Sequence, residues 1–214
     1  MRASEPQAPS TIAVLDYGIG NLRSAERALL HVGAAARLVT DPADVAGAAG
    51  VVLPGVGAFG PCAAALRRTG LHEAALGAIE AGVPFLGICV GFQLLYEGSE
   101  EAPGEAGLGV LAGRVRRLPS SVKIPQMQWN ALRSVRASTL LAGLGEEPWV
   151  YFVHSYAPDV GPETVATCEY GETLAAAAEM GTVWGTQFHP EKSGAPGLAI
   201  LANFVARCAQ RGSR

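Results

Sequence analysis

The sequence has no apolar run long enough to cross a bilayer, and its first ten residues lack the apolar stretch of a secretory signal. Its four cysteines form no CxxC pair, so neither a zinc site nor a disulfide framework is expected. Charged residues make up only 16% of the 214 residues, against 49% hydrophobic residues, which excludes a largely disordered chain. We therefore expect a cytoplasmic protein with no membrane partner, no metal and no cofactor.

The sequence also lacks an excess of basic charge. Its net charge is −3, and the 16 lysines and arginines are scattered. The only local cluster, Arg114, Arg116 and Arg117, is equally consistent with the solvated face of a strand. No nucleic-acid partner is expected.

Short apolar segments alternate with helical ones in the first half of the chain. Strands are predicted at residues 12–15, 36–39, 51–53 and 83–88, with helices at residues 22–32 and two helical segments within residues 61–82. These strands show little polar alternation, as is typical of parallel strands that helices cover on both faces. After about residue 110 the pattern changes to short strands separated by Pro, Gly and Asn, at residues 111–118, 149–153, 164–169, 174–179 and 183–186, before a last helix at residues 197–209.

The predicted fold class is therefore α/β, with a single open, largely parallel sheet, flanking helices and an added antiparallel strand region in the C-terminal half. No linker or repeat divides the chain. We predict one domain at residues 11–210, between a disordered tail at residues 1–10 and a short tail at residues 211–214.

The segment Gly87-Ile-Cys-Val-Gly91 follows a buried strand and opens a helix. This is the pattern of a nucleophile elbow with cysteine as the nucleophile, in which small residues two before and two after permit a tight, strained turn. Such a turn exposes the sulfur of Cys89 at the carboxyl end of the sheet and at a helix N-terminus, which favours the thiolate. A buried structural cysteine is the alternative, as we expect for Cys62, Cys168 and Cys208.

A base for this nucleophile is found in Gln187-Phe-His-Pro-Glu191, just after the last predicted strand. His189 should emerge at the same edge of the sheet as Cys89, and Glu191 could hold the imidazole in the required tautomer. Taken alone, His-Pro-Glu could equally be a solvated loop. Together with the elbow it forms a nucleophile–base–acid set.

A third segment, Leu53-Pro-Gly-Val-Gly57, follows another buried strand. Its glycines leave backbone N–H groups free to stabilise an oxyanion, although an ordinary strand-to-helix turn would have the same composition. A phosphate cradle is a poorer reading, because the third glycine and the Lys-Ser/Thr of nucleotide-binding loops are missing.

With these segments in view, the sequence resembles the class I (triad) glutamine amidotransferases. Within that family it is most similar to the glutaminase subunits of imidazole glycerol phosphate synthases, which act in histidine biosynthesis. The resemblance covers nearly all of residues 12–209, and its marks are Asp16-Tyr-Gly-Ile-Gly-Asn-Leu-Arg-Ser24, Leu53-Pro-Gly-Val-Gly-Ala-Phe-Gly60, Gly87-Ile-Cys-Val-Gly-Phe-Gln-Leu-Leu95 with Ser99-Glu-Glu101, Tyr151-Phe-Val-His-Ser-Tyr156 and Gln187-Phe-His-Pro-Glu-Lys-Ser193.

The resemblance implies that Cys89 attacks the side-chain amide of glutamine, that His189 moves the protons and that Glu191 orients His189. It also implies roles for two further groups of residues. Gly55, Val56 and Gly57 would form the oxyanion loop, and Gln93, Glu101 and the backbone near Ser155 would hold the glutamine.

The resemblance further implies a heterodimer with a (β/α)8-barrel cyclase. Ammonia would pass through the barrel to PRFAR, giving imidazole glycerol phosphate and AICAR. Asn21, Trp129 and Lys192 would belong to the docking face, although a core position for Trp129 is an open alternative. The sequence departs from the family at Gln126 and Gln128, where His and Gly are common.

Other functions remain possible at this point. Another synthase, such as pyridoxal phosphate synthase, uses a glutaminase with the same triad. A hydrolase or peptidase could use the same elbow on a different amide. A non-enzymatic binding domain is disfavoured, because nucleophile, base and acid are all present.

Overall fold

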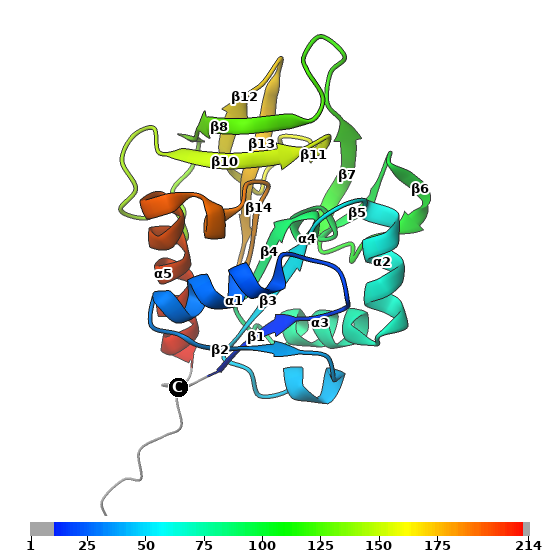
Figure 1. Cartoon of the computed structure of the whole chain (residues 1–214), viewed down its shortest axis with the longest axis vertical. Helices are drawn as coiled ribbons and strands as arrows, with labels where there is room; N and C mark the ends of the chain where they lie inside the picture. The colour runs from blue at the N-terminus through cyan, green and yellow to red at the C-terminus, as the bar shows by residue number, and fades with distance from the viewer. Residues whose placement is uncertain (1–10, 212–214) are drawn as a thin grey trace, which may run out of the picture.

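The computed structural model describes residues 11–211 and is built around an eight-stranded sheet (Figure 1). Five strands on one side of this sheet pair in parallel and the other three are antiparallel. The order is β2 (Ala35–Val39), β1 (Thr11–Leu15), β3 (Gly50–Gly55), β4 (Phe85–Cys89), β14 (Val183–Thr186), β13 (Thr173–Met180), β12 (Thr164–Glu169) and β9 (Arg133–Ser134). The predicted α/β class is confirmed. The predicted tail at residues 1–10, and residues 212–214 of the other, lie outside the described residues.

Helices cover both faces of the parallel strands, and every residue of β3, β4 and β14 is buried. Helix α1 (Leu22–His31) packs against α5 (Gly194–Arg211), whereas α2 (Phe59–Arg68) packs against α3 (Leu71–Glu80). Figure 1 shows α5 and α2 on opposite sides of the sheet. Within residues 11–211, no helix has both the length and the apolarity that a membrane span requires.

The short elements η1 (Pro42–Val45), α4 (Val90–Gln93) and η2 (Pro190–Lys192) complete the helical part. Helix α4 follows β4 directly and η2 comes three residues after β14. Both therefore lie at the carboxyl ends of neighbouring parallel strands. This is the edge at which open α/β sheets bind their ligands.

Two smaller sheets lie beyond that edge. Strands β8 (Gln126–Ala131) and β10 (Trp149–His154) form an antiparallel ribbon, drawn across the upper part of Figure 1. The other small sheet has the order β11 (Tyr156–Pro158), β7 (Leu111–Arg117), β5 (Tyr96–Ser99) and β6 (Ala102–Ala106). Strands β5, β6, β9 and β11 were not predicted, because they are short and their residues show no regular alternation of polar and apolar side chains. Strand β8 was not predicted either, although its six residues do alternate between polar and apolar side chains.

The glycines around the β4–α4 turn are required for backbone packing. A Cβ on Gly91 would lie 1.8 Å from the carbonyl oxygen of Leu53 on the neighbouring strand. A Cβ on Gly87 would lie 2.7 Å from the carbonyl oxygen of Gly91. Backbone atoms cannot give way as a flexible side chain can, so α4 reaches this position only because both residues are glycine.

We predict that Gly91→Ala destabilises the fold by at least about 4 kcal/mol, because the added methyl group overlaps the backbone of β3. Gly77→Ala is the matched control. Gly77 lies within α3 with nothing within 4 Å of its ideal Cβ, so alanine there should stabilise the fold by about 0.5–1 kcal/mol. Urea denaturation of both variants measures the difference, and equal stabilities would contradict the packing argument.

Candidate active site

Cys89 lies at the junction of β4 and α4 with φ 55° and ψ −111°. Among residues 11–211 it is the only residue other than glycine with a positive φ. A strained backbone at one residue, held by Gly87 and Gly91, is the geometry of the predicted nucleophile elbow. Helix α4 is only four residues long, so the helix dipole that was expected to favour the thiolate is weak.

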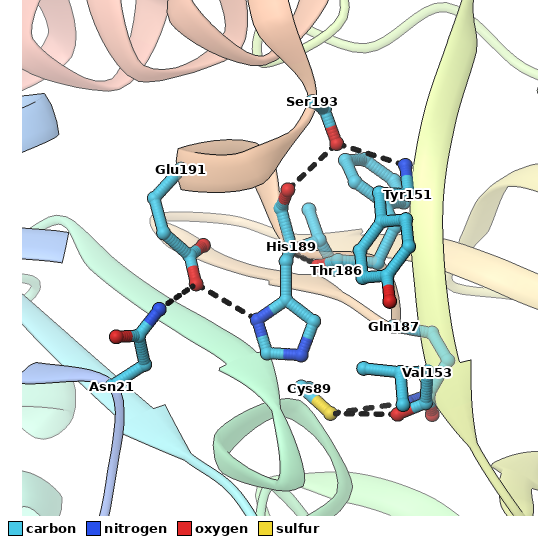
Figure 2. Close-up of polar contacts among 10 residues, drawn as sticks. Asn21, Cys89, Tyr151, Val153, Thr186, Gln187, His189, Glu191 and Ser193 are labelled. Carbon is cyan, nitrogen blue, oxygen red and sulfur yellow. Dashed lines mark hydrogen bonds and ion pairs between the residues drawn. The ribbon is translucent and has the colours of Figure 1, made fainter. Parts of the chain in front are cut away.

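His189 and Glu191 form a buried pair beside Cys89 (Figure 2). Nδ1 of His189 lies 2.8 Å from Oε1 of Glu191, and each side chain is only 2% exposed. Burial alone would lower the pKa of His189, but its interactions with Cys89 and Glu191 outweigh burial and raise the pKa to about 9. Figure 2 shows the other ring nitrogen, Nε2, on the side of Cys89. The three residues thus stand in the order nucleophile, base and acid.

The sulfur of Cys89 has two further polar neighbours. It lies 3.9 Å from the carbonyl oxygen of Val153 and 3.8 Å from Nε2 of Gln187. The Oε1 of Gln187 accepts a hydrogen bond of 3.0 Å from Nε2 of Gln93, which also donates to the carbonyl of Tyr156. The sequence analysis assigns no role to Gln187; its place directly after a buried strand and two residues before His189 is the available signal.

A cavity of about 370 Å³ opens at the sulfur of Cys89. This volume lies in the usual range for a small-molecule site. Most of the predicted site residues line it, namely Val56, Gly57, Cys89, Gln93, Glu101, Ser155, His189 and Lys192. Gly55 instead ends β3 and packs behind the elbow, where a Cβ would lie 2.6 Å from the backbone nitrogen of Gly91. Glu101 accepts a hydrogen bond of 2.8 Å from the backbone N–H of Phe59, at the start of α2.

Two side chains hold the carbonyl groups of the loop at residues 54–57. The Tyr17 hydroxyl donates to the carbonyl of Pro54 at 2.6 Å. The Cys62 thiol donates to the carbonyl of Val56 at 3.3 Å. The predicted oxyanion loop is therefore held just before its first residue and at its middle residue, with the Val56 carbonyl directed toward α2. Neither Tyr17 nor Cys62 was predicted to contact this loop.

His154 lies in the cavity wall as a neutral residue. Burial lowers its pKa to about 4, the nearby His189 lowering it as well. Its Nδ1 lies 2.9 Å from the Tyr156 carbonyl, and its Nε2 lies 2.9 Å from the side-chain amide of Gln126. A neutral ring that donates through Nδ1 can only accept at Nε2, so the buried amide of Gln126 has to present its NH2 group there. The Tyr156 carbonyl thus sets the His154 tautomer, and Gln126 is a core residue whose amide is oriented to match it.

The residues predicted at a partner interface lie in different environments. Trp129 is 46% exposed, so the alternative of a core tryptophan is wrong. It lies on the outer face of the β8–β10 ribbon with Met127 and Trp149, which are 62% and 57% exposed. Lys192 is exposed at the cavity. Asn21 is half-buried, and its Nδ2 donates to Oε1 of Glu191 at 3.3 Å.

The backbone of His189 is hydrogen-bonded to the ribbon (Figure 2). Its N–H donates to the carbonyl of Tyr151 at 3.0 Å. Its carbonyl accepts a hydrogen bond of 2.6 Å from the Ser193 hydroxyl, which in turn accepts one of 3.0 Å from the N–H of Tyr151. The sequence predicts no role for Ser193, because its partner on β10, Tyr151, lies 42 residues away.

Comparison with known proteins agrees with this geometry. A model of the "Glutamine amidotransferase class-I" family matches residues 13–208. The chain is 48% identical to imidazole glycerol phosphate synthase subunit HisH of Deinococcus radiodurans, over 95% of this chain and 97% of the relative. It is 50% identical to the subunit of the same name from a Synechococcus species, over 94% and 95%. A crystal structure of a glutamine amidotransferase shares the fold with a TM-score of 0.74 at 23% identity, over 92% of this chain and 98% of that one.

We predict that iodoacetamide at pH 7 alkylates Cys89 in the native protein and spares the other three cysteines. Cys89 opens into the cavity, whereas burial raises the pKa of Cys62 and raises that of Cys168 and Cys208 to about 12. Peptide mapping by mass spectrometry identifies the labelled site. Labelling of another cysteine at a similar rate would contradict the prediction.

The same experiment tests His189. The imidazolium supports the thiolate, so His189→Asn should slow labelling of Cys89 at pH 7 by roughly tenfold or more. Because the pKa of His189 is raised to about 9, the support is present below that pH and lost as the pH rises through it. The labelling rates of Cys89 in the wild type and in His189→Asn should therefore converge above about pH 10. A constant ratio across the whole range would count against the ion pair.

Proposed function

Because the chain belongs to the class I glutamine amidotransferase family, we propose that it is the glutaminase subunit of an imidazole glycerol phosphate synthase, with Cys89, His189 and Glu191 as its catalytic triad. The observation that carries this proposal is the position of Cys89. Its sulfur lies on a strained turn in a cavity, facing a buried histidine–glutamate pair. The near-complete coverage of both curated relatives supports the assignment to this subunit.

In the first half of the reaction, His189 has taken the thiol proton, and the Cys89 thiolate attacks the side-chain amide carbon of glutamine. The carbonyl oxygen becomes an oxyanion, which backbone N–H groups of the loop at residues 55–57 would stabilise. The intermediate then collapses as His189 returns its proton to the leaving nitrogen. Ammonia departs, and the glutamyl group stays on Cys89 as a thioester.

In the second half, His189 removes a proton from a water molecule that attacks the thioester carbon. Collapse of this intermediate breaks the C–S bond, and glutamate leaves as the Cys89 thiolate re-forms beside protonated His189. Glu191 keeps Nδ1 of His189 protonated, so Nε2 serves as the working nitrogen in both halves. No other side chain has to change its protonation state, and the new carboxyl group of the product releases its remaining proton to solvent.

Three cavity residues are proposed to hold the glutamine. Glu101 would pair with the α-ammonium group through the carboxylate oxygen that does not bond to Phe59. Gln93 would accept from the substrate, since its NH2 group already donates to Tyr156 and Gln187. The backbone at Ser155 lines the same cavity. A half-buried carboxylate of this kind would discriminate free glutamine from a peptide amide, which lacks the ammonium group.

The partner is proposed to dock on the outer face of the β8–β10 ribbon. Met127, Trp129 and Trp149 form an exposed apolar surface there, and exposed aromatic side chains are typical interface anchors. Val153 of the same ribbon lines the cavity, so ammonia released at Cys89 forms next to this surface. We propose that a (β/α)8-barrel cyclase binds here and uses the ammonia to convert PRFAR to imidazole glycerol phosphate and AICAR.

We predict that Cys89→Ala abolishes glutamine-dependent synthesis by the complex with the cyclase, while added ammonium salt still supports it. The nucleophile is needed only to make ammonia, and the cyclase accepts ammonia from any source. Formation of imidazole glycerol phosphate is measured with each nitrogen donor. If both activities are lost, Cys89 is needed for more than the release of ammonia, and the proposed role of the subunit is wrong. If the wild-type chain activates only the synthase of another pathway, the proposed partner is wrong.

We also predict that the isolated chain is a poor glutaminase. The Gly55–Val56 peptide lies between the two carbonyls that Tyr17 and Cys62 hold, and we propose that it points the wrong way at rest, so that one oxyanion donor is missing. Completing the oxyanion site then requires a change in this loop. Cyclase with its nucleotide bound should supply that change and raise ammonia release by tenfold or more, on the order of the effect of one oxyanion donor. Full turnover by the chain alone, unchanged by the complex, would contradict this.

A further inference from the structure

Asn21 occupies the N-cap position of helix α1 but does not cap the helix. Asparagine is favoured at this position because its side-chain oxygen accepts from a backbone N–H of the first turn. In this chain the side chain makes no such bond, and the backbone, with φ −85° and ψ 52°, departs from the extended geometry of a usual cap. The side chain therefore has another function.

The side chain of Asn21 is directed at the catalytic triad instead (Figure 2). Its Nδ2 lies 3.3 Å from Oε1 of Glu191, the same oxygen that accepts from Nδ1 of His189 at 2.8 Å. The two residues are 170 positions apart, so the loop before α1 meets η2 at this contact. A carboxylate can only accept, so the amide must face Glu191 with its NH2 group, and the orientation of Asn21 is fixed by chemistry.

This hydrogen bond restricts the Glu191 carboxylate. Within the described part of the chain, His189 and Asn21 are the only donors to it, and Oε2 is buried without a partner. The terminal torsion of a glutamate has a broad, nearly two-fold preference, so one donor alone leaves the carboxylate free to turn. A second donor on the same oxygen holds Oε1 toward His189. Because an amide is neutral, it does this without cancelling the charge that stabilises the imidazolium.

We propose that Asn21 is a positioning residue of the triad, which holds Glu191 so that His189 keeps Nε2 directed at Cys89. The identity of the reaction that the triad performs is taken from the proposed function. The hydrogen bonds of Asn21 and His189 to Glu191 are observed independently of that function. Asn21 does not line the cavity, so it acts on the base rather than on the bound substrate. Its effect should therefore appear in the chemical step and not in glutamine binding.

Two substitutions with side chains similar in size to asparagine separate the loss of the hydrogen bond from a change of charge. Both are measured in the full chain with its cyclase. Asn21→Leu removes the donor and should lower kcat roughly three- to tenfold, in line with the loss of one hydrogen bond, with KM for glutamine unchanged. Asn21→Asp replaces the donor with a second carboxylate near Glu191. The added negative charge should raise the pKa of His189 and move the basic limb of the pH profile to higher pH.

A second asparagine provides the matched control. Asn203, on α5, donates to the carbonyls of Leu140 at 2.9 Å and Ala142 at 2.8 Å, so it holds structure without touching the triad. Asn203→Leu should lower the melting temperature and leave kcat and the pH profile as in the wild type. If Asn21→Leu behaves in the same way, and Asn21→Asp does not shift the pH profile, Asn21 is only structural and the proposal is overturned.

The rate of iodoacetamide labelling of Cys89 against pH gives a readout that needs neither glutamine nor cyclase. Asn21→Asp should move this profile to higher pH as well, because the added negative charge acts on His189, which supports the Cys89 thiolate, while the nearby His154 stays neutral. If the wild-type chain releases no ammonia from glutamine in any complex, the proposed function is wrong. If the labelling profile of Asn21→Asp is the same as that of the wild type, the positioning role of Asn21 is wrong, and the proposed function is unaffected.

Discussion

The close approach of β3 to the turn after β4 is the constraint on which the site depends. Gly91 lies against the Leu53 carbonyl, and this contact holds Cys89 in its strained conformation. The parallel pairing of β4 with its two neighbours brings the other segments of the site to the same place. Gly55 lies opposite Cys89 on one side, and Thr186 lies opposite Ile88 on the other, so the oxyanion loop and the His189 segment both emerge beside the sulfur. Three chain segments thus meet at one point because three neighbouring strands end together.

The electrostatics of the site follow from burial. His189 and Glu191 are almost wholly removed from water, which costs free energy unless each charge has a partner. Their mutual hydrogen bond, the adjacent Cys89 and the amide of Asn21 supply those partners. His154, only a few residues along the ribbon from Tyr151, has no anionic partner and is neutral. Two histidines in one cavity therefore differ in charge at neutral pH because a carboxylate contacts only one of them.

Local sequence patterns predicted much of this arrangement. The parallel strands, the elbow at Cys89 and the His189–Glu191 pair each depend on residues close together in the chain, and the fold places them as expected. The contacts of Asn21 with Glu191, of Gln187 with Cys89 and of Ser193 with Tyr151 could not be predicted in this way. The two residues of each pair lie 42 or more positions apart, and no local rule relates them. Strand β8 was missed although Gln126–Ala131 alternates between polar and apolar side chains, because the alternation is inverted: Gln126 is buried, whereas the apolar Met127 and Trp129 are exposed.

Tyr151 contributes both its N–H and its carbonyl to the segment that carries His189, directly and through Ser193. Strand β10, which bears the exposed Trp149 and pairs with the strand of Trp129, is therefore hydrogen-bonded directly to the segment of the catalytic base. This limits how the protein can evolve. A lineage that adapts to a different synthase can exchange the outward-facing side chains of β8 and β10 freely, but any insertion or register shift in β10 would displace the base as well. Side-chain identity on this surface should therefore drift quickly between subfamilies, while the length and register of the strand beneath stay the same.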